Sequence, residues 1–287
     1  MSKKLKKIYE DRKIDDKRSI SGHPGREMFA RKDILIVCAL EQETHHDQKG
    51  VGQLWAPSGI DNYFEDERQI LYTGVGKVNA TFKLTQRLHS SHLRLSPFLR
   101  NHHLPPMPKI VINYGTAGSR ELPIGELVDC TRFIQRDMDA TSVGFLKGQT
   151  PFDDDILSTG GKVGGPYGGL LGPTNQGMMI DFRDKPLNPD YGSEHPINTI
   201  KKHCICGSGD NFVDDIENEI DIIDVFDMEA YALAKVCYYY KVPFISFKYI
   251  TDNANEHSPK DWKDNLENGI IEFIERVLES ETMGKIK

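Results

Sequence analysis

Three long apolar runs constrain the fold of this chain more than any other feature. They occupy residues 33–40, 109–114 and 243–250 and are rich in Ile, Val, Leu and Phe. Parallel strands that are covered on both faces produce such runs, whereas strands with one wet face alternate apolar and polar residues. A sheet buried on both faces needs helices on both sides, so the sequence predicts an α/β domain.

The remaining periodic segments complete one sheet rather than two independent units. Further strands are predicted over residues 68–73, 127–134 and 203–207, and helices over residues 78–88, 224–240 and 262–279. Ser258 is expected to cap the last helical region, with Pro259 at its first helical position. This order predicts a single α/β domain over residues 33–287, with a mixed, twisted central sheet flanked by helices.

Two segments stand apart from this pattern. Residues 1–32 hold eleven Lys/Arg against five Asp/Glu and have no apolar stretch, so we expect a basic N-terminal extension rather than a secretory signal. The extension could also be a contact arm for a partner subunit or a polyanion. Residues 158–195 hold a dense set of glycines and are predicted to form a Gly-rich insertion. Loops of this length in a domain are usually functional or disordered.

Bulk properties exclude several classes of partner. The net charge of −7 argues against nucleic acid, and no apolar run approaches the length of about 18 residues that spans a membrane. The five cysteines lie mostly in apolar runs, which favours the reducing cytoplasm. Cys204 and Cys206 form a Cys-x-Cys pair without a second ligand pair, so no metal site is expected.

Three carboxylates follow expected strands or the helix packed on one. They are Glu43, Glu229 and Asp252. Ligands of α/β sheets bind outside the carboxyl ends of the strands, so the three are expected to converge on a site that handles protons and sugar hydroxyls. Glycine-rich turns are predicted at residues 74–77 and 115–118, where backbone amides could approach a ligand. Neither turn has the spacing of a P-loop.

Seven short motifs carry a family resemblance. In chain order they occupy residues 39–43, 74–80, 113–118, 136–151, 207–212, 227–230 and 251–252. Together they resemble the nucleoside phosphorylase/nucleosidase superfamily, and within it the 5′-methylthioadenosine/S-adenosylhomocysteine nucleosidases, over about residues 34–277. The resemblance implies a nucleoside phosphorylase-like fold and hydrolysis of the N-ribosidic bond of such purine nucleosides, with release of adenine. It also implies a homodimer and no metal or organic cofactor.

The resemblance gives each carboxylate a separate role. Glu43 would activate water on the sugar face opposite the base. Asp252 would be the general acid that protonates N7 of the leaving purine, help that is worth roughly 10²–10⁴ in rate. For this, Asp252 would have to carry a proton near neutral pH. Glu229 would accept hydrogen bonds from the 2′- and 3′-hydroxyls, which contribute about 1.5–3 kcal/mol each.

Further residues are implied to bind the substrate. They are Met228, Phe212, Val213, Thr116, Ala117, Gly118, Pro151 and Trp262. Phe212 would stack on the purine, and Met228 would pack under the ribose. Val143 stands where an aromatic residue of the neighbouring subunit often closes the pocket around the 5′-group, so the 5′-substituent is left open.

Two other functions compete with hydrolysis of these nucleosides. Phosphorolysis requires an arginine-lined pocket for phosphate, and Arg120 is placed to supply it, but the charge of Glu43 would repel a phosphate dianion. A nucleosidase for another 5′-modified or phosphorylated purine nucleoside is a variant of the same chemistry. A non-catalytic, ligand-binding relative is disfavoured because all three carboxylates are present.

Overall fold

The computed structural model describes residues 33–46, 58–59, 69–93, 104–151, 179–182 and 197–279. The expected extension at residues 1–32 and most of the expected insertion lie outside the described residues. The strands of the main sheet are β1 (Ile34–Cys38), β4 (Ile70–Tyr72), β5 (Ile110–Ser119), β6 (Leu127–Gln135), β7 (Met179–Asp181), β8 (Cys204–Ser208), β9 (Val225–Asp227) and β10 (Phe244–Asp252). A separate pair is formed by β2 (His45–His46) and β3 (Ser58–Gly59).

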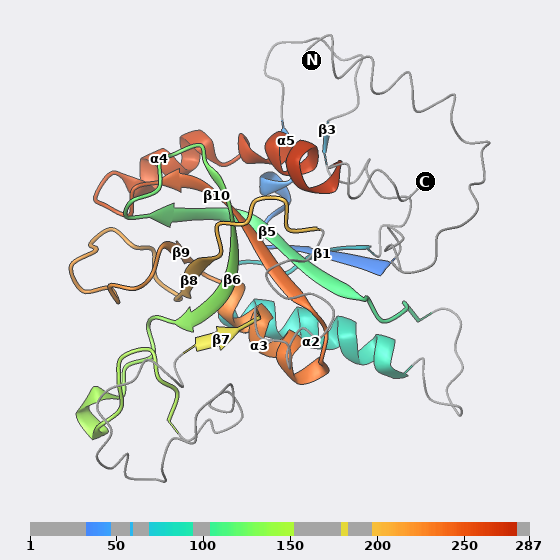
Figure 1. Cartoon of the computed structure of the whole chain (residues 1–287), viewed down its shortest axis with the longest axis horizontal. Coiled ribbons are helices and arrows are strands. Elements are labelled where there is room, and N and C mark those ends of the chain that lie inside the picture. Colours follow the sequence, from blue (N-terminus) through green and yellow to red (C-terminus); the bar gives the residue numbers. More distant parts are fainter. Residues whose placement is uncertain are drawn as a thin grey trace.

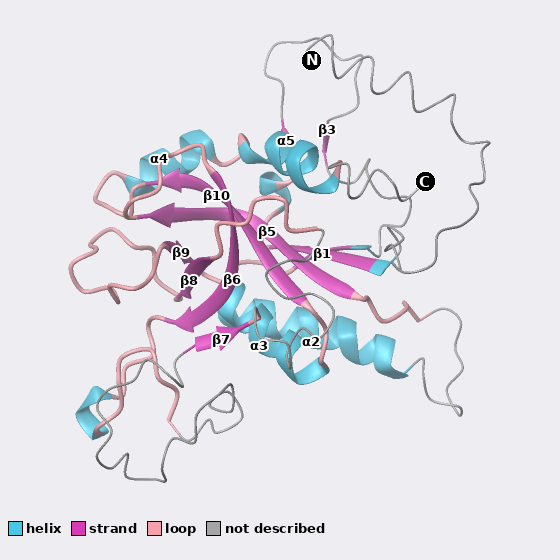
Figure 2. Ribbon diagram, in the orientation of Figure 1, coloured by secondary structure: helices cyan, strands magenta, loops and turns pink. Residues whose placement is uncertain are grey.

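Helices cover both faces of the sheet (Figures 1 and 2). On one face lie α2 (Lys77–Leu93) and α3 (Ala230–Tyr240), and on the other lie α4 (Ser258–Asn265) and α5 (Gly269–Phe273), which continues into π-helix η6 (Ile274–Leu278). Short 3₁₀ turns are η2 (Glu41–Glu43) and η5 (Thr141–Val143). The predicted α/β class with a mixed sheet is therefore confirmed. None of the helices among the described residues is both long and apolar enough to cross a membrane.

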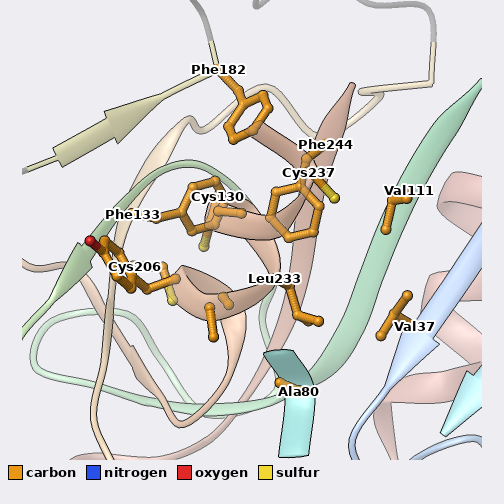
Figure 3. Packing of buried hydrophobic residues seen from close by; sticks show 14 of the residues in the cluster. Val37, Ala80, Val111, Cys130, Phe133, Phe182, Cys206, Leu233, Cys237 and Phe244 are labelled. Atoms are coloured by element: carbon orange, nitrogen blue, oxygen red, sulfur yellow. The ribbon is translucent and has the colours of Figure 1, made fainter. Parts of the chain in front are cut away.

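Each apolar strand contributes side chains to two separate hydrophobic cores, because successive side chains point to opposite faces of the sheet. In β1, Leu35 and Val37 join the cluster that packs against α2 and α3, part of which is drawn in Figure 3. Ile34 and Ile36 join the cluster that includes Phe273 of α5. This division explains why the run at residues 33–40 shows no polar alternation.

Five strands pair in a closed ring, which the sequence did not predict. The ring runs β5–β10–β6–β8–β9 and returns to β5, while β1 and β4 extend from β5 in parallel. It is closed where Gly118 and Ser119 pair antiparallel with Phe226 and Val225. Closure leaves none of these five strands with a free edge.

Two predicted elements around this closure are wrong. The expected turn at residues 115–118 is strand, because β5 continues to Ser119 by pairing with β10 and then with β9. The expected helix at 224–240 begins only at Ala230, because residues 225–227 form β9 between β8 and β5. In both places tertiary pairing overrides the local pattern.

The C-terminal helical region also differs from the prediction. It is not one helix over 262–279, because α4 ends at Asn265, whose side-chain amide donates to the carbonyl of Thr251 in β10. Ser258 lies within α4 rather than capping it, and its hydroxyl accepts a hydrogen bond from the amide of Asn255. The predicted insertion is not wholly loop, since its described part contains β7.

Candidate active site

A cavity of about 360 Å³ lies beside the carboxyl ends of β1, β5, β9 and β10. Ten of the predicted site residues line it: Glu43, Thr116, Ala117, Gly118, Phe212, Val213, Met228, Glu229, Asp252 and Trp262. All three predicted carboxylates therefore meet in one place. Pro151 does not line this cavity within its own chain.

Glu43 is held against the backbone of β5. It is the last residue of η2, directly after β1, and its side chain is buried, whereas Glu41 is exposed. One carboxylate oxygen accepts hydrogen bonds from the amide and the hydroxyl of Thr116, both at 2.8 Å, and the other accepts from the amide of Leu40 at 3.1 Å. Three donors fix this carboxylate at the cavity wall.

Trp262 of α4 supports the same arrangement. Its indole N–H donates to the hydroxyl oxygen of Thr116 at 3.1 Å, so the hydroxyl proton of Thr116 is left to point at Glu43. The Trp262 ring meets Phe212 edge-on, with ring centroids 6.3 Å apart. Trp262 thus joins the carboxylate end of the cavity to its aromatic wall.

Asp252 is the last residue of β10 and is 2% exposed. Its two oxygens accept from the amide of Ala254 and the hydroxyl of Thr251, each at 3.0 Å. Gly118 lies opposite Asp252 in the parallel pair of β5 and β10, and a Cβ at position 118 would come within 2.6 Å of the carboxylate. Position 118 must therefore be glycine to leave room for the carboxyl group.

Glu229 precedes α3 and is anchored by the turn after β4. The amide of Gly76 donates to its Oε1 at 2.8 Å. Burial, reinforced by the negative charge of Asp227, raises the pKa of Glu229 to about 8. Near neutral pH the ligand-free cavity thus holds a mostly protonated carboxyl group at this position.

The raised pKa predicts a pH-dependent stability of the ligand-free protein. Between the ordinary value of 4.5 and about 8 the folded state holds a proton on Glu229 that the unfolded chain has lost, so stability falls as pH rises. Glu229→Gln removes the titration and keeps an acceptor for Gly76. We expect the melting temperature of the variant, relative to wild type, to increase from about pH 5 to pH 8 in a calorimetric series. A constant or shrinking difference would contradict this.

The sequence prediction missed a buried ion pair at the cavity wall. Lys248 Nζ lies 2.8 Å from Asp227 Oδ2, and both side chains are 1% exposed. Burial disfavours both charges, but their attraction outweighs it and holds the pKa of Asp227 below its usual value and that of Lys248 above. Asp227 also accepts from the hydroxyl of Ser208 and the amide of Ala230. The signal was a single Lys within the apolar run 243–250, since lysine is rarely buried unless paired.

Other lining residues were also not singled out. They are Ala39, Leu40, Val75, Arg136, Asn211, Phe226, Asp227, Pro259 and Lys263. Several lie inside the quoted motifs, so the signal was present without an assigned role. The walls are mostly apolar around a few convergent carboxyl groups, which is typical of a site for a small organic ligand. Fold and cavity define an α/β protein with a carboxylate-lined cavity at the carboxyl ends of its strands.

The comparison with known families agrees with this description. Residues 62–280 match the family model of the phosphorylase superfamily. Since the match covers most of the chain, the protein belongs to the phosphorylase superfamily.

Two related proteins belong to the same group of nucleosidases. The chain is 28% identical over 218 residues to a 5′-methylthioadenosine/S-adenosylhomocysteine nucleosidase of an Exiguobacterium strain, which covers 73% of this chain and 77% of the relative. It is 27% identical over 221 residues to the nucleosidase of the same name from Bacillus cereus, with 73% and 80% covered.

Solved structures show the same fold. The nucleosidase of Colwellia psychrerythraea in complex with adenine gives a TM-score of 0.53 at 19% identity, with 88% of this chain and 95% of that chain covered. The Streptococcus pneumoniae enzyme in complex with 8-aminoadenine gives 0.53 at 16% identity, with 89% and 100% covered. The predicted nucleoside phosphorylase-like fold is therefore confirmed.

Proposed function

We propose that this protein hydrolyses the N-ribosidic bond of purine nucleosides of the 5′-methylthioadenosine/S-adenosylhomocysteine type and releases adenine. The observation that carries the proposal is the meeting of Glu43, Glu229 and Asp252 in one cavity. The names of the related nucleosidases support the same reaction and substrate class.

The three carboxyl groups divide the reaction among them. Breaking the bond develops positive charge on the sugar and negative charge on the base. Asp252 donates a proton to N7 of the leaving purine, and Glu43 removes a proton from the attacking water on the other side of the sugar. Glu229 binds the ribose hydroxyls. These hydrogen bonds tighten as the ring flattens and so stabilise the transition state.

The base and the sugar contact the apolar part of the wall in this proposal. Phe212 stacks on the purine, and the backbone of Val213 meets the base edge. Met228 lies beside the ribose. Phe212 is 40% exposed in the ligand-free chain, so its ring is accessible to a base.

The surroundings of the cavity favour water over phosphate as the attacking group. Arg120, the arginine expected to support phosphorolysis, does not line the cavity, and its guanidinium contacts Asp221 and the carbonyl of Ile216. Arg136 does line it, but it is engaged by Glu219 and Asn211. The carboxylate of Glu43 would repel a phosphate dianion at the site of attack.

A product assay tests this proposal. The protein is incubated with methylthioadenosine, S-adenosylhomocysteine, adenosine, inosine and adenosine monophosphate, each with and without phosphate. We expect adenine and a free 5-thiosugar from the first two nucleosides without phosphate. A phosphate requirement with a sugar 1-phosphate product would show phosphorolysis, cleavage of the monophosphate alone would shift the substrate class, and no cleavage would favour a binding relative.

Glu229→Gln gives a separate test of the sugar contact. Above pH 8, where Glu229 is ionised, we expect the variant to lose about 10- to 100-fold in kcat/KM on methylthioadenosine, because a charge-assisted bond to a hydroxyl is weakened. The loss on the 2′-deoxy analogue should be smaller, since one hydroxyl is already missing. Equal losses on both substrates would remove Glu229 from the sugar site.

We also propose that the protein is a homodimer. Val78 and Phe82, one turn apart on α2, are 77% and 63% exposed and form an apolar stripe on the helix that begins two residues after the cavity-lining Val75. Val143 and Pro151 do not line the cavity of their own chain, and we expect them to act in the site of a partner. Light scattering should give a dimer for wild type and a monomer for Phe82→Asp, whereas a wild-type monomer would contradict the proposal.

We propose that the enzyme works in the cytoplasm, since its five cysteines are buried and form no disulfide. We propose that residues 33–287 form the catalytic domain. Residues 1–32 would be a basic extension that precedes it, and residues of about 158–195 would be a Gly-rich insertion within it.

A further inference from the structure

A buried arginine at the cavity wall contacts the proposed base-binding segment and has no role in the reaction described above. Arg136 follows β6 directly and is 2% exposed. One terminal nitrogen donates to Glu219 Oε1 at 2.8 Å and to Asn211 Oδ1 at 3.2 Å, and the other donates to the backbone carbonyl of Asn211. A Cβ at Gly209 would lie 2.7 Å from the guanidinium carbon, so the chain at Gly209 rests directly on the guanidinium group.

Asp137, the next residue after Arg136, fixes position 210, which lies between Gly209 and Asn211. Asp137 accepts a hydrogen bond from the amide of Asp210 at 2.9 Å, and it is paired with Lys77. The amide of Lys77 in turn donates to the side chain of Asp210 at 2.8 Å. Three consecutive positions, 209 to 211, are therefore fixed by two consecutive residues that follow β6. Phe212 and Val213, which line the cavity, come next in the chain.

The orientation of the guanidinium group favours the segment over its acidic partner. A two-pronged pair with the carboxylate would be the strongest arrangement for Arg136 and Glu219. Instead, Arg136 Nε and Glu219 Oε2 are buried without partners, and the pair meets through one nitrogen and one oxygen. The other donors are directed at Asn211. Glu219 thus balances the charge, while the segment determines where the guanidinium points.

We propose that Arg136 is a positioning residue for the purine base. It holds residues 209–211 in the shape that presents Phe212 and Val213 to the ligand, and so determines the affinity for the base more than the rate of bond cleavage. The inference rests on the proposed purine-nucleoside function. Lysine cannot replace Arg136, because a single ammonium group cannot reach the two acceptors of Asn211 and the carboxylate of Glu219 in the fixed geometry of the guanidinium fork.

The test compares Arg136→Lys with Arg132→Lys. Arg132 lies within β6, the strand that Arg136 follows, and its guanidinium donates to the carbonyl of His203. Calorimetric titration with free adenine should show an affinity at least about 10-fold weaker for Arg136→Lys, as expected for losing one charge-assisted hydrogen bond, and nearly unchanged for Arg132→Lys. With methylthioadenosine, the rise in KM should exceed the fall in kcat. Equal adenine affinities for the two variants, or a fall in kcat with unchanged KM, would overturn the proposal.

A second variant covers the case in which Arg136→Lys does not fold. The double variant Arg136→Met, Glu219→Leu removes the buried charge together with its partner, which preserves folding better than removing one charge. If it folds with weakened adenine binding, the positioning role stands, and normal adenine binding would refute it. The adenine titration also separates this inference from the proposed reaction, because it gives a result even if wild type cleaves none of the nucleosides. Wild-type protein that fails to bind adenine would overturn both.

Discussion

Replacing Asp252 with asparagine is expected to lower kcat on methylthioadenosine by about 10²–10⁴, the range of general acid catalysis. Asparagine keeps the size of the side chain and an acceptor for the amide of Ala254, but it cannot transfer a proton to the purine. Stopped assays of adenine release at saturating substrate measure the effect. Because the site beside Gly118 is filled to contact distance, an isosteric change is the suitable one at this position.

A substrate with a better leaving group separates proton donation from mere positioning. The 4-nitrophenolate group of a 4-nitrophenyl riboside leaves without being protonated. Asp252→Asn should therefore lose far less activity on this substrate than on methylthioadenosine. Asp264→Asn, on the exposed side of α4, is the matched control and should keep full activity. If Asp252→Asn lost the same factor on both substrates, or lost nothing on either, Asp252 would not be the acid.

Replacing Lys248 with methionine is expected to lower the free energy of unfolding by about 3–5 kcal/mol, the usual cost of breaking a buried ion pair from one side. The change leaves Asp227 charged and buried with the hydroxyl of Ser208 and the amide of Ala230 as its remaining donors. Urea denaturation at neutral pH measures the loss. The same change in Lys260, which is exposed on α4, should have little effect.

The double variant Asp227→Asn, Lys248→Met identifies the cause of that loss. Asparagine carries no charge, so removing both charges should restore a large part of the stability that Lys248→Met loses. Losses that simply add would show that the two side chains stabilise the fold independently. That outcome would contradict the ion pair between Asp227 of β9 and Lys248 of β10.

The parts of the fold that depend on local pattern were predictable from the sequence. The runs that became β1, β5 and β10 pack on both faces, and burial on both faces leaves a clear record in composition. The ring closure left no such record, because β9 is only three residues long and merges with the pattern of α3. Its strand state comes from pairing with partners distant in the chain.

The site divides in the same way. The positions of Glu43, Glu229 and Asp252 could be predicted because acids that follow strands must lie at one end of the sheet. The role of Gly118 could not be predicted. Its segment was predicted to be a turn, but Gly118 lies in β5 opposite Asp252 of the neighbouring strand β10. The partner of Lys248 could not be predicted either, because β9 and β10 are distant in the chain and only the fold brings Asp227 and Lys248 together.

The register of β5 against β10 has a consequence for how this chain can change in length. Seven consecutive pairs run from Phe244 opposite Val111 to Ile250 opposite Ala117, and an irregularity then places Asp252 opposite Gly118. Inserting or deleting one residue within either strand would turn the following side chains to the opposite face of the sheet. Indels in descendants of this sequence should therefore be absent from these two strands and collect in the connections, so that the chain can lengthen elsewhere without displacing its acid.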